Sequence, residues 1–394
     1  MKYNFTKLLA FIAVILFAPF AAAQDFGLII NQKMSLADRD YVYYSATALP
    51  WFAAPLGEKA GLYLSGGASA EYENGTWAFV PEVYRFEVTC RPSDSAAFGF
   101  GRQNFRDGTG WVMNGLFDGV SAAFAVNGGW LDFGVFYTGL LYKKTAAITI
   151  SQKDQFDYYM NDTYFASRRV AGGVNWEKTS IFDSESSFWF SALFQFDLND
   201  VENENKVHSQ YLTAKFAVPL NNTLNLECGA AAEILEKPNF SAAFAAFADM
   251  AWLFYGKYFS MFTLGGRFSS GEWNDVIAAF SPVTGQPQGR VLLPDFFGIA
   301  LAQADYMLRL HRTLSAELYA AYLFRTDIGS SGTAGTGSAS PLLGGEVYIG
   351  FSWAPFSDLV FTLGGGVFLP QLGKAFANDS GVKYRVEITA GISL

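Results

Sequence analysis

The chain has 394 residues, of which 51% are hydrophobic, 17% are aromatic and only 16% are charged, and its formal net charge is −9. This composition excludes intrinsic disorder, which requires low hydrophobicity and high charge. The charged fraction is well below the quarter or so that soluble domains carry, which predicts a surface that largely avoids water.

The amino terminus has the pattern of a secretory signal. Lys2 and Lys7 flank the start of the chain, residues 8–20 are wholly apolar, and three alanines end at Ala23. This order of charged, apolar and small residues predicts cleavage after Ala23. A retained anchor is the alternative, but the apolar run is short. We therefore predict a signal peptide over residues 1–23 and one exported domain over residues 24–394.

No later run is long and apolar enough for a membrane-spanning helix, which needs about 18 residues or more. Instead, apolar and polar residues alternate along the mature chain. Between Val382 and Leu394 every even-numbered residue is apolar, whereas Lys383, Arg385 and Glu387 occupy odd positions. Successive side chains of a strand point to opposite faces, so this segment is predicted to be a strand with one apolar face.

Segments of about ten alternating residues joined by turns are typical of a membrane-spanning β-barrel. We count eighteen such segments and predict a transmembrane antiparallel barrel of eighteen strands, with sixteen as the alternative. The segment 240–254 is also compatible with an amphipathic helix. The predicted strands are 25–32, 41–53, 60–72, 78–91, 96–104, 116–127, 130–142, 166–177, 187–197, 207–218, 223–235, 240–254, 258–269, 297–310, 314–325, 342–353, 358–369 and 382–394.

The connections support an up-and-down topology. The four longest, 143–165, 270–296, 326–341 and 370–381, all follow odd-numbered strands, and the tight turns follow even-numbered ones. Bacterial barrels of this kind have long extracellular loops and short periplasmic turns. Both termini are therefore predicted on the periplasmic side of an outer membrane.

The polar face of the predicted strands carries charges of both signs. In a wide barrel such residues line a water-filled lumen, where facing cations and anions can select permeants. The alternative is that they pair across strands and serve stability alone. The predicted lining residues are Arg85, Glu87, Arg169, Lys215, Arg267, Asp305, Arg309, Glu317, Arg325, Glu346, Lys383, Arg385 and Glu387.

Signals for catalysis are weak. The sequence has only two histidines, His208 and His311. His208 is adjacent to Ser209, so on a strand their side chains point to opposite faces and cannot form a nucleophile and base pair. Cys90 and Cys228 have no zinc or redox spacing. We expect no enzymatic activity, no metal and no cofactor.

Several short motifs resemble the alginate-export-like porins of diderm bacteria. They are Gly101-Arg102-Gln103, Asp107-Gly108, Phe117-Asp118-Gly119-Val120, Leu343-Gly-Gly-Glu346 and Phe368-Leu-Pro370. The resemblance implies an eighteen-stranded barrel that exports or admits polyanionic or small polar solutes. It also implies that Arg102 is a cation at the pore rim and a further channel-lining residue; alternatively, Arg102 braces the adjoining loop through hydrogen bonds to Asp118.

The sequence thus predicts an outer-membrane porin in which small polar or charged solutes diffuse through a charged lumen, narrowed by inward folding of loops 143–165 and 270–296. One alternative is a surface adhesin that displays loops 143–165, 270–296 and 326–341. A hydrophobic-substrate transporter would require an apolar interior. The expected partners are outer-membrane lipids, small solutes and the barrel-assembly machinery, with a homotrimer left open and no nucleic acid.

Overall fold

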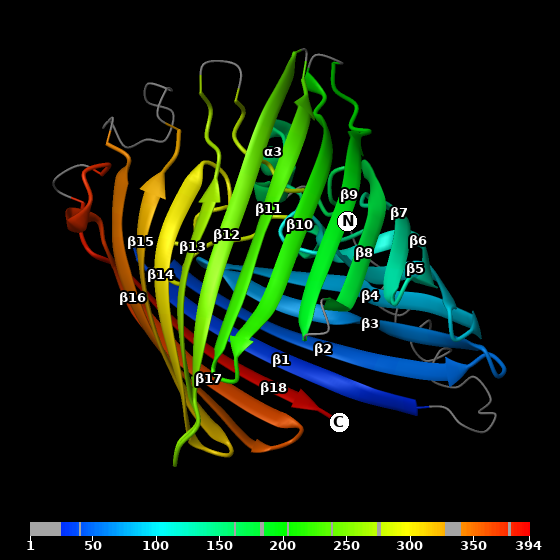
Figure 1. Ribbon diagram of the computed structural model, residues 1–394, viewed down its shortest axis with the longest axis horizontal. Coiled ribbons are helices and arrows are strands. Elements are labelled where there is room, and N and C mark those ends of the chain that lie inside the picture. Colours follow the sequence, from blue (N-terminus) through cyan, green and yellow to red (C-terminus); the bar gives the residue numbers. More distant parts are fainter. Residues whose placement is uncertain are drawn as a thin grey trace.

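The computed structural model describes residues 25–38, 41–160, 163–181, 185–202, 205–237, 239–273, 277–327, 340–376 and 380–394. Within them, eighteen strands form one continuous wall (Figure 1). The strands are β1 (Asp25–Ala37), β2 (Tyr41–Pro55), β3 (Ala60–Glu73), β4 (Thr76–Ser93), β5 (Ala96–Arg106), β6 (Asn114–Val126), β7 (Gly129–Tyr137), β8 (Arg169–Ile181), β9 (Ser186–Asp197), β10 (His208–Asn221), β11 (Leu224–Glu236), β12 (Phe240–Phe254), β13 (Ser260–Ser269), β14 (Ile299–His311), β15 (Leu314–Arg325), β16 (Leu342–Phe356), β17 (Leu359–Leu369) and β18 (Lys383–Ser393).

The sheet closes on itself. Each strand is antiparallel to its neighbours in the sequence, and β1 pairs with both β2 and β18, with Ile29 opposite Ser393. The predicted barrel of eighteen strands is confirmed, and the sixteen-stranded alternative is wrong. Residues 240–254 form strand β12 rather than a helix.

The two largest corrections to the predicted boundaries concern the first and seventh strands. The first strand continues beyond residue 32 to Ala37, because Lys33 and Ser35 keep the alternation of the strand and pair with β2 and β18. Strand β7 ends at Tyr137, five residues before the predicted end at 142. Residues 138–142 leave the wall and enter the interior, where Leu141 is fully buried. The predicted signal peptide and most of loop 326–341 lie outside the described residues.

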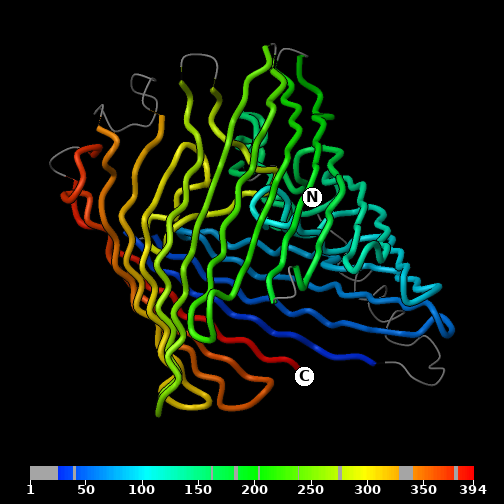
Figure 2. Tube along the Cα trace, in the orientation of Figure 1, coloured from blue at the N-terminus to red at the C-terminus, as the bar shows by residue number. Residues whose placement is uncertain are grey.

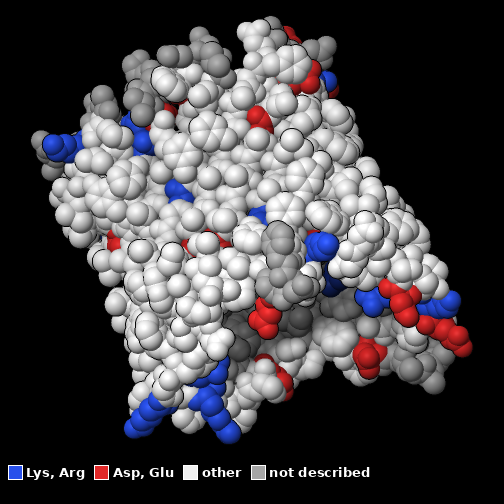
Figure 3. All heavy atoms as spheres, in the orientation of Figure 1, with Lys and Arg blue, Asp and Glu red and all other residues white. Residues whose placement is uncertain are grey.

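Alternation along the strands separates an apolar outer face from a polar inner face. Large apolar side chains such as Phe100, Leu264 and Leu318 are half exposed on the outside. Most of the face seen in Figure 3 is free of charge, and charged side chains gather toward its edges. An exposed apolar band around a closed barrel is the arrangement that a lipid bilayer requires.

The upper interior is filled by three connections that fold back into the barrel (Figure 2). These are residues 107–113, the described part of 138–168 with helices α2 (Lys143–Ala146) and α3 (Gln152–Tyr159), and the described part of 270–298. Their apolar side chains join the inner wall in one buried cluster that includes Trp111, Phe280 and Phe296. The predicted inward folding of loops 143–165 and 270–296 is therefore confirmed for the part of each loop that is buried in this cluster, such as Ile148 and Phe280, whereas Tyr159 and Trp273 stay exposed. A short 3₁₀ helix, η2 (Pro370–Leu372), follows β17.

The wall is incomplete between the upper parts of β4 and β5. Strand β4 pairs with β5 only from Phe86 to Ser93, so its upper residues 76–85 pair with β3 alone. The connection after β7 closes this gap: the Tyr142 amide donates to Glu82 Oε1 at 2.9 Å, and the Tyr164 hydroxyl donates to the Pro81 carbonyl. Proline is suited to such an edge because it has no N–H to leave unpaired.

Candidate functional site

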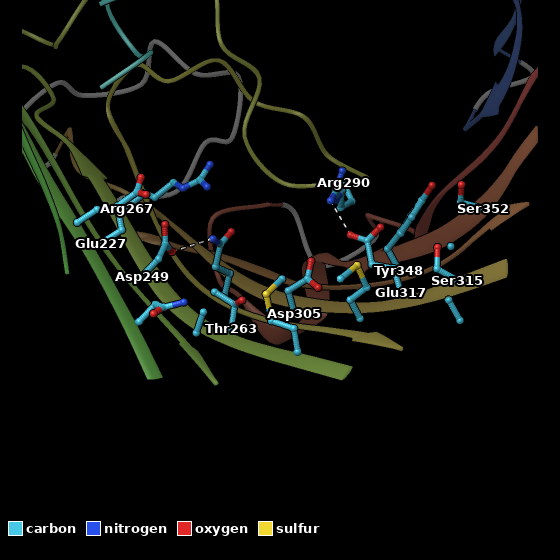
Figure 4. Close-up of a pocket in the computed structure, with 18 of the residues that line it drawn as sticks. Glu227, Asp249, Thr263, Arg267, Arg290, Asp305, Ser315, Glu317, Tyr348 and Ser352 are labelled. Atoms are coloured by element: carbon cyan, nitrogen blue, oxygen red, sulfur yellow. Dashed lines mark hydrogen bonds and ion pairs between the residues drawn. The ribbon is translucent and has the colours of Figure 1, made fainter. Parts of the chain in front are cut away.

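Below the infolded connections lies a cavity of about 930 Å³ on the inner face of strands β10–β17 (Figure 4). Its lining is rich in charged and polar side chains that alternate with the outward apolar residues of the same strands. The carboxylates outnumber the guanidinium groups. The charged lining residues are Glu185, Glu227, Asp249, Asp305, Glu317, Arg267 and Arg290.

Arg290 reaches the cavity from above, from the connection between β13 and β14 (Figure 4). Its guanidinium donates to Glu317 Oε1 at 2.5 Å and lies 5.6 Å from the centre of the Tyr319 ring. The Arg290 side chain remains 47% exposed. Arg290 can therefore release Glu317 and bind a passing anion while its guanidinium stays in contact with water.

Arg267 is the second cation of the cavity. It donates to Gln288 Oε1 at 3.0 Å and stands 6.0 Å from the centre of the Trp111 ring. Gln288 belongs to the connection after β13 and Trp111 to the connection after β5. Arg267 thus joins the wall to two infolded connections at the upper end of the cavity.

A chain of polar groups crosses the cavity floor. The Gln303 amide donates to Asp249 Oδ1 at 3.3 Å, and its oxygen accepts from the Tyr319 hydroxyl at 3.3 Å. These residues come from β12, β14 and β15. Polar groups fixed across neighbouring strands offer a solute a succession of donors and acceptors in place of water.

The connection after β13 is held by carboxylates of the wall. Glu346 is 1% exposed and accepts from the backbone N–H groups of Arg290, Val291 and Leu292 at 2.6, 3.2 and 3.1 Å. Nearer to the start of the same connection, the Ser281 amide donates to Glu233 at 2.8 Å. These contacts fix the height at which Arg290 enters the lumen.

The connection after β7 is anchored by Arg169, which is fully buried. Its guanidinium donates to Asp154 Oδ2 at 2.5 Å, Asp197 Oδ2 at 3.2 Å and Gln195 Oε1 at 2.5 Å. Asp154 also closes the capping box of α3 with Ser151. A single guanidinium therefore ties the first turn of α3 to the inner wall at β8 and β9.

The predicted lining residues fall into four groups. Those with carboxylate partners in the interior are Arg85 with Glu87, Lys215 with Glu227, Arg325 with Asp327, and Arg385 with Glu387, which also pairs with Lys33. Glu317 and Asp305 line the cavity with Arg267. Arg309 lies 5.9 Å from the Phe259 ring centre and Lys383 lies 5.0 Å from that of Phe376. Arg169 and Glu346 point inward but serve as buried anchors of the connections.

Arg102 is not a cation of the pore rim, and its assignment to the lining is corrected. It shares the outward side of β5 with Phe98 and Phe100 and lies opposite Asp118. Its guanidinium makes two bonds of 2.8 Å to Asp118 and one of 3.0 Å to the carbonyl of Leu140. It also donates to Glu82 Oε1 at 3.4 Å and to the Val83 carbonyl. The alternative role, bracing a loop through Asp118, is the one that the structure shows.

Sequence patterns missed Arg290, Gln303 and the anchors Glu82, Glu233 and Asp154. Arg290 and Asp154 lie in connections, where strand alternation gives no direction. The Asp107-Gly108-Thr109-Gly110 sequence was the available signal for an infolded turn: Asp107 accepts from the amides of Thr109, Val112 and Met113.

Burial raises the pKa of the Tyr142 phenol in the connection after β7, with nearby Glu71 adding to the effect, so this group stays protonated at neutral pH.

Replacing Tyr211 with Phe is expected to lower the free energy of unfolding by about 1 kcal/mol. The Tyr211 hydroxyl donates to the Ser281 carbonyl at 2.6 Å, and the phenylalanine ring would leave that buried carbonyl unpaired. The urea midpoint of the detergent-folded barrel measures the change. Tyr306→Phe is the matched control because Tyr306 faces outward and is 37% exposed; equal midpoints for the two variants would contradict the anchoring role.

The described residues hold neither a membrane-spanning helix nor a cluster of metal ligands. No described helix is long and apolar enough to cross a membrane. No group of three or more His, Cys, Asp or Glu side chains in the described part of the chain could hold a metal ion. His208 accepts from the Asp197 amide at 3.0 Å, whereas neighbouring Ser209 is buried on the inner face.

No family model matches the sequence, and no curated protein matches it. Solved structures share the fold. Pseudomonas aeruginosa OprD matches with a TM-score of 0.64 at 15% identity, covering 94% of this chain and 93% of that one. P. aeruginosa OpdK with vanillate matches with a TM-score of 0.66 at 10% identity, covering 95% and 100%. P. aeruginosa OccK5 (OpdH) matches with a TM-score of 0.63 at 11% identity, covering 96% of this chain and 99% of that one.

These matches correct the resemblance to alginate-export-like porins, which is wrong: the structures that share the fold over nine tenths of the chain include OprD, OpdK and OccK5. The motifs behind the resemblance have a local explanation. Gly101 and Arg102 lie directly opposite Gly119 and Asp118 in the β5–β6 hairpin. Short segments that fit one hairpin and its ion pair do not identify a family.

Proposed function

We propose that this chain is an outer-membrane channel through which small polar or charged solutes diffuse passively. The single observation that carries the proposal is the charged cavity of about 930 Å³ inside a closed barrel whose outer face is apolar. Water and polar solutes can occupy such an interior, whereas the outer face suits lipid. The solved structures of similar fold include an outer membrane protein, OprD, and a protein crystallised with vanillate, OpdK.

The infolded connections give the channel its selectivity in this proposal. They fill the upper interior with a packed apolar cluster and leave polar groups at its lower surface. Arg290 and Arg267 then face a wall that carries Asp249, Asp305 and Glu317. A solute passing this point exchanges water for fixed charges of both signs, which favours small polar molecules over apolar ones.

The proposal disfavours the two alternative functions. A hydrophobic-substrate transporter would need an apolar path, and this cavity is lined by seven charged residues. An adhesin would display its long loops, whereas apolar residues of 143–165 and 270–296, such as Ile148 and Phe280, are packed inside the barrel. The proposal assigns no enzymatic activity. It includes membrane insertion by the barrel-assembly machinery, and chemical cross-linking in the membrane would decide whether the chain forms a homotrimer.

Single-channel recording of the refolded mature chain in a planar bilayer tests the proposal. We expect stable conductance steps whose reversal potential in a salt gradient depends on the charge of the ions. Folded and inserted protein that gives no steps would contradict it.

Changing Arg85, Arg267 and Arg385 together to Glu is expected to raise the cation-to-anion permeability severalfold, because six units of negative charge are added to the interior. The reversal potential in a KCl gradient measures this ratio. Arg312→Glu, in the turn between β14 and β15, is the control outside the cavity. An unchanged ratio in the triple variant, with conductance intact, would exclude a charged filter at these residues.

A further inference from the structure

A hollow on the outer wall has no role in the channel. It lies across β9, β10 and β11, has a volume of about 390 Å³ and is almost wholly apolar. Leu212 of β10 pairs with Ala192 of β9 on one side and with Ala232 of β11 on the other, and the small alanine side chains form the hollow. Phe194 and Ile234 bound it one step nearer to the extracellular ends of the strands.

A polar side chain, Gln210, lies between Phe194 and Ile234 on this apolar surface. Its amide has no hydrogen-bond partner in the described part of the chain, and it is only partly exposed. An amide that faces hydrocarbon without a hydrogen-bond partner is strongly destabilising. The position therefore needs a polar group from outside the protein.

We propose that the hollow binds one acyl chain of an outer-leaflet lipid, with the carbonyl or hydroxyl at the head end of that chain hydrogen-bonded to Gln210. This inference rests on the membrane location in the proposed function. The acyl chain packs over Ala192 and Ala232 and is held between the larger side chains around them. The amide N–H of Gln210 donates to the lipid oxygen.

The depth of Gln210 agrees with this occupant. It is the third residue of β10, so it lies about 7 Å along the strand from the extracellular end. The bilayer has polar interfacial regions outside a hydrocarbon core of about 30 Å, and the first carbonyls of a lipid lie at that boundary. The surface around the hollow is the apolar outer wall, with Leu212 56% exposed and Ile234 52% exposed, and it is continuous with the lipid-facing band.

Native mass spectrometry of the full barrel released from nanodiscs of palmitoyl-oleoyl phosphatidylethanolamine tests the site. Ala232→Phe fills the hollow, and Gln210→Leu removes the amide at similar size. Ala230→Phe adds the same bulk to the outer face of β11 but outside the hollow, because Ala230 is not part of its lining. We expect one retained lipid on the wild type and on Ala230→Phe, at least about tenfold less on Ala232→Phe, and severalfold less on Gln210→Leu.

Retention of lipid by Ala232→Phe equal to that by the wild type would overturn the proposal, and so would a wild type that retains none. A wild-type dimer that Ala232→Phe makes monomeric would assign the hollow to a second copy of the chain and would also overturn it. The channel proposal is tested separately, because all four proteins should give the same conductance: Gln210 and Ala232 face outward.

Discussion

Replacing Arg169 with Met is expected to lower the free energy of unfolding by about 3–5 kcal/mol. Arg169 is fully buried, and its removal leaves the carboxylates of Asp154 and Asp197, both at most 1% exposed, without their cation. Removing one partner of a buried ion pair lowers stability strongly because the remaining charge stays buried away from water. Urea unfolding of the detergent-folded barrel, followed by tryptophan fluorescence, measures the loss.

Two further variants separate this anchor from a general effect of losing a charge. Lys144→Ala breaks an ion pair with Glu73 in which both side chains are at least 35% exposed, so its expected cost is below about 1 kcal/mol. Adding Asp154→Asn to the Arg169 variant removes one stranded charge and should restore part of the lost stability. A loss below about 1 kcal/mol for Arg169→Met, no more than an exposed ion pair contributes, would show that the guanidinium does not hold α3 to the wall.

The strands were predictable because lipid outside and water inside impose a period of two on the sequence. Strand β18 shows this plainly: Tyr384, Val386 and Ile388 are exposed on the outer face, as the alternation of Val382 to Leu394 predicts. The same alternation also predicts the correct direction of the Arg102 side chain. It has the parity of Phe98 and Phe100, which both face outward, and only the resemblance to alginate-export-like porins suggested that Arg102 lies at the pore rim.

The site was less predictable, because its groups meet through tertiary contacts of connections. Arg290 lies 56 positions from Glu346, which holds its amide, and Ser281 lies 48 positions from Glu233. No local pattern encodes such pairs: each carboxylate is at an ordinary inward position of its strand. Composition and alternation therefore established a charged interior, whereas the docking of the connections decided which charges remain open to a solute.

Replacing Glu346 with Gln is expected to release the tip of the connection after β13 and to enlarge the channel. The carboxylate accepts from three successive backbone amides, and a glutamine offers one oxygen together with an NH₂ group that cannot accept. Hydrogen bonds to a charged group contribute about 1.5–3 kcal/mol each, so we expect the free energy of unfolding to fall by about 2–3 kcal/mol.

Conductance distinguishes this release from simple destabilisation. With its backbone freed, Arg290 no longer has a fixed height above Glu317, and single-channel steps should become larger and noisier in Glu346→Gln. Glu317→Gln is the matched control: it also neutralises a partner of Arg290, but the pair is 47% and 29% exposed and anchors no backbone amide. It should alter ion selectivity at nearly unchanged stability. Identical conductance of Glu346→Gln and the wild type would mean that the narrowest part of the channel does not depend on this connection.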